Sequence, residues 1–487
     1  MGVKTREQYI DSIRKQKPQD AWMRGEKVTN IADNPAFFTG INSIAGSYDI
    51  ATRPEYKSWA QLQSPLINET ISRWVHIPRN AEESALRADL LRTTLYDYFC
   101  CPRCIVADTG TAMWAATWEM DQKYGTEYHK RYVEYWKHVQ KNDMEIATAA
   151  TDPKGDRMKR PAEQDDPDLY LHIVDKQKDG IVVRGAKHCI TGILYCNDVM
   201  VIPTRDLRKG EEAYAVAFSI PIDTPGIKYV ARPMGSLRPP ESIEHPFGRK
   251  AGHVETLVIF NDVFVPNERV FMCGEVDYAA SLVINFASLH RFTKCACRSA
   301  QTELYVGATQ LMAECNGIER APHVQDKITD IIIAAEIAKA CCYSSAYLGK
   351  MHPSGCYIID MLPVNVGKYV SSHAQGDQWI TMHDIAGGAS VTTPTQKDWD
   401  HPELRPYLEK YYRGPSHING ETRLRALKLI EDLTSCEFAG WTMGISLNGA
   451  GNPVAEKMEI YRRFDRRRVR DIMARHAGIK ELPARPR

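Results

Sequence analysis

Cysteine and histidine side chains occur in two compact groups that could together hold a metal. The first group is the run Cys100–Cys104, and the second lies in the sequence HRFTKCAC, from His290 to Cys297. On a helix, positions seven apart lie two turns along one face, and positions three or four apart also share a face. Either Cys100 or Cys101 could therefore pair with Cys104, and Cys297 is the better partner for His290. Two facing helices could then supply three thiolates and one imidazole, a set that suits zinc or an iron–sulfur cluster.

Each cysteine group also has a simpler interpretation. Most free cysteines are small buried apolar residues, and a single histidine in a helix is more often a core or surface residue than a ligand. Two such groups in one chain favour the shared metal site over two unrelated packing features.

The overall composition indicates which kind of protein carries these cysteine and histidine groups. The 487 residues are 43% hydrophobic and 25% charged, with a formal net charge of +1, as in ordinary globular proteins of several domains. This balance, together with the apolar residues interleaved in the basic run near the C-terminus, predicts no nucleic-acid partner. No apolar run is long enough for a membrane span. The thirteen cysteines, without a signal-peptide pattern, indicate reduced thiols and a cytoplasmic protein.

The hydrophobic periodicity predicts an α+β protein in three parts. Residues 1–147 have mostly helical periodicity, and residues 148–275 contain short β-branched runs divided by turns. Within that part, the sequence DGIVVRGAKHCITG predicts two strands around a tight bend. Residues 276–487 return to long helical patterns. We therefore expect a helical domain, a β domain and a helical bundle.

Three short segments could bind a flavin. The loop TDPKGDR combines a turn with two cations that suit a phosphate or a flavin, although a surface loop explains it equally simply. The expected bend between two strands at residues 187–192 offers hydrogen-bonding groups to a planar ring, and paired glycines later in the chain allow backbone amides to approach a pyrophosphate. The candidate residues are Thr151, Asp152, Lys154, Gly155, Asp156, Arg157, His188, Thr191, Gly387 and Gly388.

Glu255 lies inside the apolar strand pattern HVETLVIF. A carboxylate held there in the interior could serve as a general base. An outward-facing residue of an alternating strand accounts for the same pattern, so both interpretations stand.

Taken together, these residues resemble the 4-hydroxybutyryl-CoA dehydratases, a branch of the 4-hydroxyphenylacetate 3-hydroxylase family. The resemblance extends over nearly the whole chain, through EQYI, DQKYGTEYHK, TDPKGDR, DPDLYLHIV, DGIVVRGAK, FNDVFVPNERVF and DIAGG. It implies an acyl-CoA-dehydrogenase-like fold with a four-helix bundle at the C-terminal end, assembled as a homotetramer. It also implies FAD and a [4Fe–4S] cluster, with Cys100, Cys104, His290 and Cys297 as the cluster ligands.

The implied activity is that of a hydro-lyase that removes water from a 4-hydroxyacyl-CoA by a radical mechanism, with isomerisation of the 3-enoyl thioester as a second reaction. FAD would exchange one electron, and the cluster would act as Lewis acid toward the departing hydroxyl. By resemblance, His290 is a candidate base, Glu255 transfers or positions a proton, and Arg298 contacts CoA.

Two residues depart from the pattern of this branch, which has Tyr at the position of Lys294 and, by a weaker alignment, Glu at the position of Ile445. Both positions are expected to be catalytic, so these changes leave the acyl substrate open. Three alternatives remain: a divergent paralogue with another substrate, an FAD-dependent aromatic hydroxylase, and a zinc-stapled protein without catalytic activity.

Overall fold

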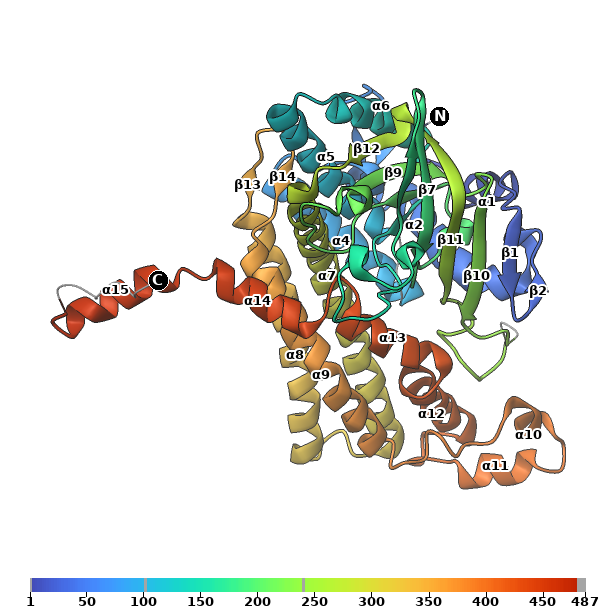
Figure 1. The fold of residues 1–487 in the computed structure, drawn as a ribbon. Coiled ribbons are helices and arrows are strands. Elements are labelled where there is room, and N and C mark those ends of the chain that lie inside the picture. The colour runs from blue at the N-terminus through green and yellow to red at the C-terminus, as the bar shows by residue number, and fades with distance from the viewer. Residues whose placement is uncertain (1, 100–102, 239–240, 480–487) are drawn as a thin grey trace.

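The computed structural model describes residues 2–99, 103–238 and 241–479. Helices and strands are both abundant, as the α+β prediction requires (Figure 1). The first 141 residues contain the helices α1 (Arg6–Arg14), α2 (Phe38–Thr52), α3 (Lys57–Ala60), α4 (Ala81–Tyr98), α5 (Cys104–Tyr124) and α6 (Tyr128–Lys141).

Local signals explain where the longer of these helices begin and end. Asn80 caps α4 by accepting a hydrogen bond from the backbone N–H of Glu83. Gly125 ends α5 in the left-handed conformation, with φ of 68°, which glycine adopts without steric cost. The interior of α5 is rich in small buried residues, so neighbouring helices can pack closely against it.

Two sheets lie between the helical parts. The larger has the order β2-β1-β10-β11-β7-β6, and the smaller has the order β12-β9-β8-β5. The strands of the larger sheet are β1 (Asp20–Met23), β2 (Glu26–Lys27), β6 (His172–Lys176), β7 (Gly180–Lys187), β10 (Ile227–Met234) and β11 (His253–Pro266). Those of the smaller are β5 (Ile146–Ala149), β8 (Asp198–Val201), β9 (Val216–Pro221) and β12 (Val270–Cys273).

The N-terminal part also contributes strands, which its helical periodicity did not predict. β1 pairs in parallel with β10, and the short strands β3 (Gln61–Gln63) and β4 (Thr70–Ser72) pair with each other. These strands are two to four residues long, too short to produce a detectable alternation. The prediction of two strands in DGIVVRGAKHCITG was wrong, because only β7 forms there and a loop with Gly192 at φ of 76° follows it.

β11 shows why one face of the large sheet is accessible. Its alternate residues Val254, Val258 and Phe260 are buried in the core, whereas Glu255, Leu257 and Ile259 lie on the other, half-exposed face. The same alternation in β7 and β10 extends this outer face across three neighbouring strands.

Long helices form the remainder of the chain. α7 (Val276–Asn316), α8 (Pro322–Tyr347) and α9 (Met361–Ile385) lie side by side, and α5 packs against α7 (Figure 1). The further elements are β13 (Lys350–Met351), β14 (Tyr357–Ile358), α10 (Gln396–Asp400), α11 (Arg405–Tyr411), α12 (Gly420–Thr434), α13 (Glu437–Asn448), α14 (Pro453–Arg463) and α15 (Arg466–His476). α14 crosses the bundle, and α15 projects away from the rest of the molecule. In the described ranges, no helix has the length and apolar character that a membrane span requires.

Candidate active site

The strongest chemical feature of the interface between α5 and α7 is a buried histidine–carboxylate pair. His290 of α7 places its Nδ1 2.8 Å from Oδ2 of Asp108 on α5. Asp108 is completely buried, and His290 is 9% exposed. A carboxylate can only accept, so Nδ1 carries the hydrogen and the imidazole presents Nε2 as its free nitrogen. A ring fixed in this way is the usual arrangement of a metal-bound histidine.

Two further side chains hold Asp108 in place. Arg87 of α4 forms a short ion pair with Oδ1, and the Thr293 hydroxyl donates to the same oxygen at 3.0 Å. Arg87 also donates to the carbonyl of Cys104 at 3.1 Å. Because Arg87 is only 2% exposed, its charge and that of Asp108 compensate each other away from water.

The predicted ligands Cys104 and Cys297 lie on the same two helices as this pair. Cys104 is the first residue of α5, one turn before Asp108, and Cys297 lies two turns after His290 on the continuous helix α7. Both cysteines are at most 5% exposed. Cys100 lies outside the described residues. The placement of Cys100 and Cys104 on one helix face therefore stays a prediction.

Glu255 lies on the outer face of the large sheet, where α13 covers it. Its Oε1 accepts hydrogen bonds from the Thr191 hydroxyl and from Nε1 of Trp441, each at 2.7 Å. Its Oε2 is buried and has no hydrogen-bond partner among the described residues. Of the two interpretations of Glu255, the outward-facing one is therefore correct for the strand, but the carboxylate is still shielded from water.

A hollow of about 560 Å³ lies on the same face of the sheet. Leu257 and Ile259, which follow Glu255 at alternate positions of β11, line it together with His188 and Pro153. This volume falls in the range of pockets that hold a cofactor. Two of the three segments predicted for flavin binding therefore line the hollow: the loop at 151–157 through Pro153, and the following bend through His188.

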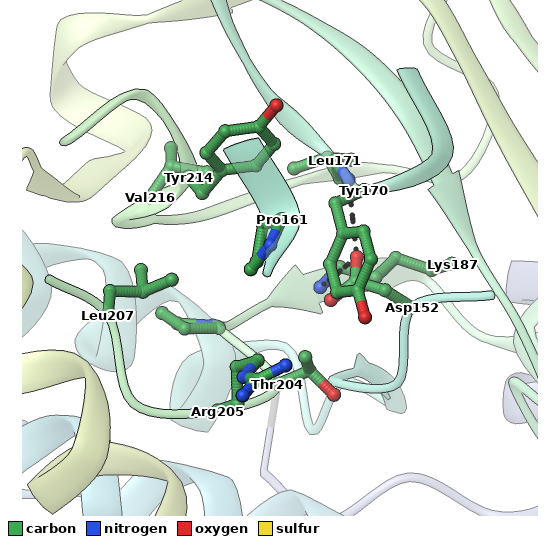
Figure 2. Close-up of a pocket in the computed structure, with 11 residues that line it drawn as sticks. Asp152, Pro161, Tyr170, Leu171, Lys187, Thr204, Arg205, Leu207, Tyr214 and Val216 are labelled. Atoms are coloured by element: carbon green, nitrogen blue, oxygen red, sulfur yellow. Dashed lines mark hydrogen bonds and ion pairs between the residues drawn. The ribbon is translucent and has the colours of Figure 1, made fainter. Parts of the chain in front are cut away.

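The residues of the loop at 151–157 divide into two groups. Asp152 is buried and forms an ion pair with Nζ of Lys187 at 2.9 Å (Figure 2). Burial raises the pKa of Asp152, against the opposing effect of Lys187. The cavity beside this pair measures about 10 Å³, room for about one water molecule, so Asp152 anchors the loop instead of facing a flavin.

The other residues of the loop are accessible to a ligand. Lys154, Gly155, Asp156 and Arg157 are exposed, whereas Thr151 is half-buried and accepts a hydrogen bond from the His188 backbone N–H at 2.7 Å. Lys154 and Gly155 both have positive φ, at 78° and 49°. These angles turn the loop sharply and leave its two cations directed at solvent.

Gly387 and Gly388 do not lie at the N-terminus of a helix, as a pyrophosphate site would favour. They follow the last residue of α9 with φ of 67° and 72°, and their amides donate to the carbonyls of Asp384 and His383. Within one subunit these amides are used to end the helix. The prediction that they approach a phosphate is not supported by this position.

Lys294 and Arg298 follow His290 along α7 at four-residue intervals, and both are buried. The Lys294 side chain lies beside Gly449, because a Cβ placed on that glycine would be 3.3 Å from Lys294 Cε. Arg298 donates from Nη1 to Gln301 at 2.9 Å, while its Nε and Nη2 have no hydrogen-bond partner among the described residues. A buried guanidinium with unused donors is suited to an anionic or carbonyl group of a ligand.

Sequence reasoning missed several residues of this region. Asp108 could have been found, because it follows Cys104 at the four-residue spacing of one helix face. Lys368 of α9 and Glu456 of α14 form a fully buried ion pair for which neither local pattern gives a signal. Ile445 lies within α13 and is half-buried, and the next buried carboxylates after it in the chain are Glu456 and Glu459 of α14.

Family models place the chain in a known group of flavin enzymes. The N-terminal model of the 4-hydroxyphenylacetate 3-hydroxylase family matches residues 5–272, and the C-terminal model matches residues 279–478. The chain belongs to this family.

Individual relatives place it more narrowly. It is 34% identical to the 4-hydroxybutyryl-CoA dehydratase/vinylacetyl-CoA-Δ-isomerase of Clostridium aminobutyricum, over 98% of this chain and 99% of that protein. A solved structure of an oxygen-tolerant archaeal 4-hydroxybutyryl-CoA dehydratase from N. maritimus is 33% identical, with a TM-score of 0.94 over 100% of this chain and 97% of that one. The chain is thus an enzyme of the dehydratase branch, as its motifs implied.

Hydroxylases of the family are also similar over most of the chain. The oxygenase component of 4-hydroxyphenylacetate 3-monooxygenase from Thermus thermophilus is 27% identical over 95% of this chain and 91% of its own. A mutant HpaB structure in complex with FAD is 25% identical, with a TM-score of 0.88 and 98% of both chains covered. The fold therefore serves two chemistries, and the site residues must distinguish between them.

Proposed function

We propose that this enzyme uses FAD and a [4Fe–4S] cluster to dehydrate 4-hydroxybutyryl-CoA, or a related 4-hydroxyacyl-CoA, to the 2-enoyl thioester, and that it also isomerises the 3-enoyl thioester. The observation that carries the proposal is the fixed His290–Asp108 pair on two helices that each carry a buried cysteine, Cys104 on α5 and Cys297 on α7. A flavin hydroxylase has no use for such a ligand set, whereas a dehydratase that must activate a hydroxyl leaving group has.

The described residues fit the proposed cluster. Cys104 and Cys297 would bind iron as thiolates and His290 through Nε2, with Cys100 as the fourth ligand. Soft thiolate ligands suit iron–sulfur clusters, and the low exposure of the three described ligands would keep water from the metal. Asp108 would serve as the outer partner that sets the imidazole tautomer.

The hollow on the outer face of the sheet is the proposed site of FAD. His188 and Thr191 would contact the ring system, and Lys154 and Arg157 would approach the phosphates, with Gly155 and Asp156 completing the turn. When bound, FAD would supply one-electron transfer, and the cluster would supply a Lewis acid for the departing hydroxyl.

Two groups of the chain would then handle protons. Asp108 occupies Nδ1 of His290, so Nε2 alone remains for both metal binding and proton transfer, and the two uses compete. Glu255 offers its Oε2 to a proton while Thr191 and Trp441 hold Oε1 in place. Arg298 would neutralise or orient a polar group of the acyl-CoA with its unused donors.

Lys294 would define the difference from other dehydratases. It lies one turn after His290 and replaces a phenol hydrogen-bond donor by a cation, which favours a substrate with an additional polar or acidic group near the reacting carbons. This is the reason to include related 4-hydroxyacyl-CoA thioesters in the proposal.

The exposed apolar residues of α14 and α15 support a homotetramer. Tyr461 is 63% exposed and Met473 is 64% exposed, and none of the residues of α15 is buried in the single chain. An isolated helix of this length is marginally stable in water, so contacts with another subunit would stabilise it. The exposed Ile333, Tyr347 and Ile380 on α8 and α9 offer further subunit contacts.

Anaerobic purification followed by iron, sulfide and flavin analysis tests the cofactors, and incubation with 4-hydroxybutyryl-CoA tests the reaction. We expect about four irons and one FAD per chain, with iron lost from a Cys297→Ala variant and flavin retained. Dehydration by the wild-type protein and none by this variant would support the proposal.

An aromatic hydroxylase is the second candidate, favoured by the FAD-bound relative with a TM-score of 0.88. It predicts a yellow protein without iron that hydroxylates a phenol when supplied with reduced flavin. Iron-free protein with that activity would replace the dehydratase proposal. A colourless protein with one zinc per chain at these cysteines would contradict both.

A further inference from the structure

A second group of metal-ligand side chains lies where the segment before β11 meets the corner between α12 and α13. It consists of His245, Asp432 and Cys436, and one ligand atom from each lies within 4.8 Å of the others. His245 belongs to the segment that joins β10 to β11, Asp432 is near the end of α12, and Cys436 is the N-cap of α13. None of these residues belongs to the proposed cluster or flavin site.

Two separations within the group are close to those between neighbouring ligands of a tetrahedral zinc ion. Nδ1 of His245 lies 3.2 Å from Oδ1 of Asp432, and Sγ of Cys436 lies 3.5 Å from the same oxygen. Zinc binds nitrogen and oxygen at about 2.0–2.1 Å and sulfur at about 2.3 Å, so neighbouring ligands of a tetrahedral ion are roughly 3.3–3.6 Å apart. Both separations also correspond to hydrogen bonds to Oδ1, so the same geometry that holds the three groups together without a metal would need little change to coordinate one.

The carboxylate is also oriented by an outer set of hydrogen bonds. The backbone N–H groups of Phe247 and Gly248 donate to Oδ2 of Asp432 at 2.7 and 2.9 Å, which leaves Oδ1 for a metal. Asp432 is 1% exposed, whereas the His245 side chain is 25% exposed and opens the group to solvent. His245 has a φ of 52°, a conformation that is rare outside glycine and that turns its ring toward α12.

Neighbouring charges are compatible with a cation. Arg249 lies close enough for its charge to interact with that of Asp432, but its guanidinium donates to the carbonyls of Ser242 and Glu244. The Cys436 thiol donates its hydrogen to the Asp432 carbonyl at 3.0 Å, and a metal would bind the deprotonated sulfur. Binding of a divalent ion would therefore release this proton to solvent.

We propose that His245, Asp432 and Cys436 form a structural site for a zinc-class divalent ion, with water as the fourth ligand. The ion would join the segment before β11 to the start of α13. That helix carries Trp441, which donates to Glu255, so the ion would also fix one wall of the proposed active site.

Zinc analysis of the holoenzyme tests this proposal without relying on activity. The protein is equilibrated with Zn²⁺, passed over a chelating resin and analysed for zinc and iron per chain. The principal variant is Cys436→Ser, because serine is itself a good N-cap and should keep α13 intact. Cys273→Ser, which changes another half-buried cysteine, is the matched control. His245→Ala removes a second ligand.

We expect the wild-type protein and Cys273→Ser to retain about one zinc more per chain than Cys436→Ser and His245→Ala. We also expect affinity in these two variants to fall by more than about 100-fold, beyond the 10- to 100-fold effect of losing an outer hydrogen-bond partner. In a second measurement, Zn²⁺ should slow alkylation of Cys436 by iodoacetamide but not that of Cys273. Equal zinc content in wild type and Cys436→Ser, or alkylation of Cys436 unaffected by Zn²⁺, would overturn the proposal.

Discussion

Replacing Asp108 by asparagine should release the proposed cluster by changing the tautomer of His290. Arg87 and the Thr293 hydroxyl both donate to Oδ1 of Asp108, so an asparagine must keep its single oxygen on that side. Its amide NH₂ then faces Nδ1 of His290, which must accept instead of donate. The imidazole hydrogen moves to Nε2, the nitrogen that would bind iron.

The size of the effect on iron binding and on stability follows from two interactions of Asp108, one with His290 and one with Arg87. Loss of an outer-shell partner weakens metal binding about 10- to 100-fold, which corresponds to about 1.4–2.7 kcal/mol. In addition, Arg87 is 2% exposed and loses its carboxylate, which lowers the free energy of unfolding by about 3–5 kcal/mol. The substitution should therefore affect iron retention and stability together.

The rate of iron release into a chelator, measured anaerobically by absorbance and iron content, separates the effect on iron retention from the effect on stability. Asp198→Asn is the matched control, because Asp198 is 3% exposed and is paired with Arg269 at 2.7 Å, in the sheet region. We expect release to be 10- to 100-fold faster in Asp108→Asn and unchanged in Asp198→Asn. Release at the wild-type rate from Asp108→Asn would refute the tautomer argument, and equal acceleration in both variants would attribute the effect to general destabilisation.

Three further predictions concern proton transfer, substrate and acid stability. Glu255→Gln can still accept from Thr191 with its amide oxygen, so we expect kcat to fall about 10²- to 10⁴-fold in a dehydration assay with little change in Tm. Lys294→Tyr should raise kcat/KM for 4-hydroxybutyryl-CoA at least about tenfold, because it restores a phenol donor beside the reacting carbons. Burial raises the pKa of Glu83, but its contacts with His76 and Arg79 outweigh burial and bring the pKa to about 2 from 4.5. The free energy of unfolding should therefore fall as the pH decreases from 4.5 toward 2, by at most about 3 kcal/mol, and Glu83→Gln should lack this part of the decrease in acid denaturation experiments.

Each of these predictions has an outcome that contradicts it. A Glu255→Gln variant with full activity would exclude a proton-transfer role for that carboxylate. Lower kcat/KM in Lys294→Tyr, with the cofactors retained, would indicate that the lysine serves a different substrate. Identical pH dependence in wild type and Glu83→Gln would remove Glu83 from the acid response.

Features set by residues close together in the sequence could be predicted, whereas features set by contacts between distant residues could not. α7 was predictable because His290 and Cys297 share one continuous helix, and helical spacing alone relates their directions. Glu255 was predictable only as a residue of an alternating strand. Its shielding comes from Trp441, which is 186 residues away and has no local signal.

Other features could not be obtained from local pattern at all. The buried ion pair between Lys368 of α9 and Glu456 of α14 joins residues 88 positions apart, and neither local sequence predicts the other partner. The glycines at 387 and 388 have the composition of a phosphate-binding turn, but they end a helix, and sequence does not distinguish these two uses of positive φ.

The arrangement of α7 also bears on how such a site can open and diversify. His290, Thr293, Lys294, Cys297 and Arg298 lie on one stretch of helix about 12 Å long, and they must move as a single rigid body. α5 contributes Cys104 and Asp108 from the opposite side, so a small separation of these two helices would expose all the proposed metal ligands of both helices together. A substitution at position 294, by contrast, changes one side chain of α7 without changing how the two helices pack. Selection at this position could therefore change the substrate while the proposed metal ligands stay the same.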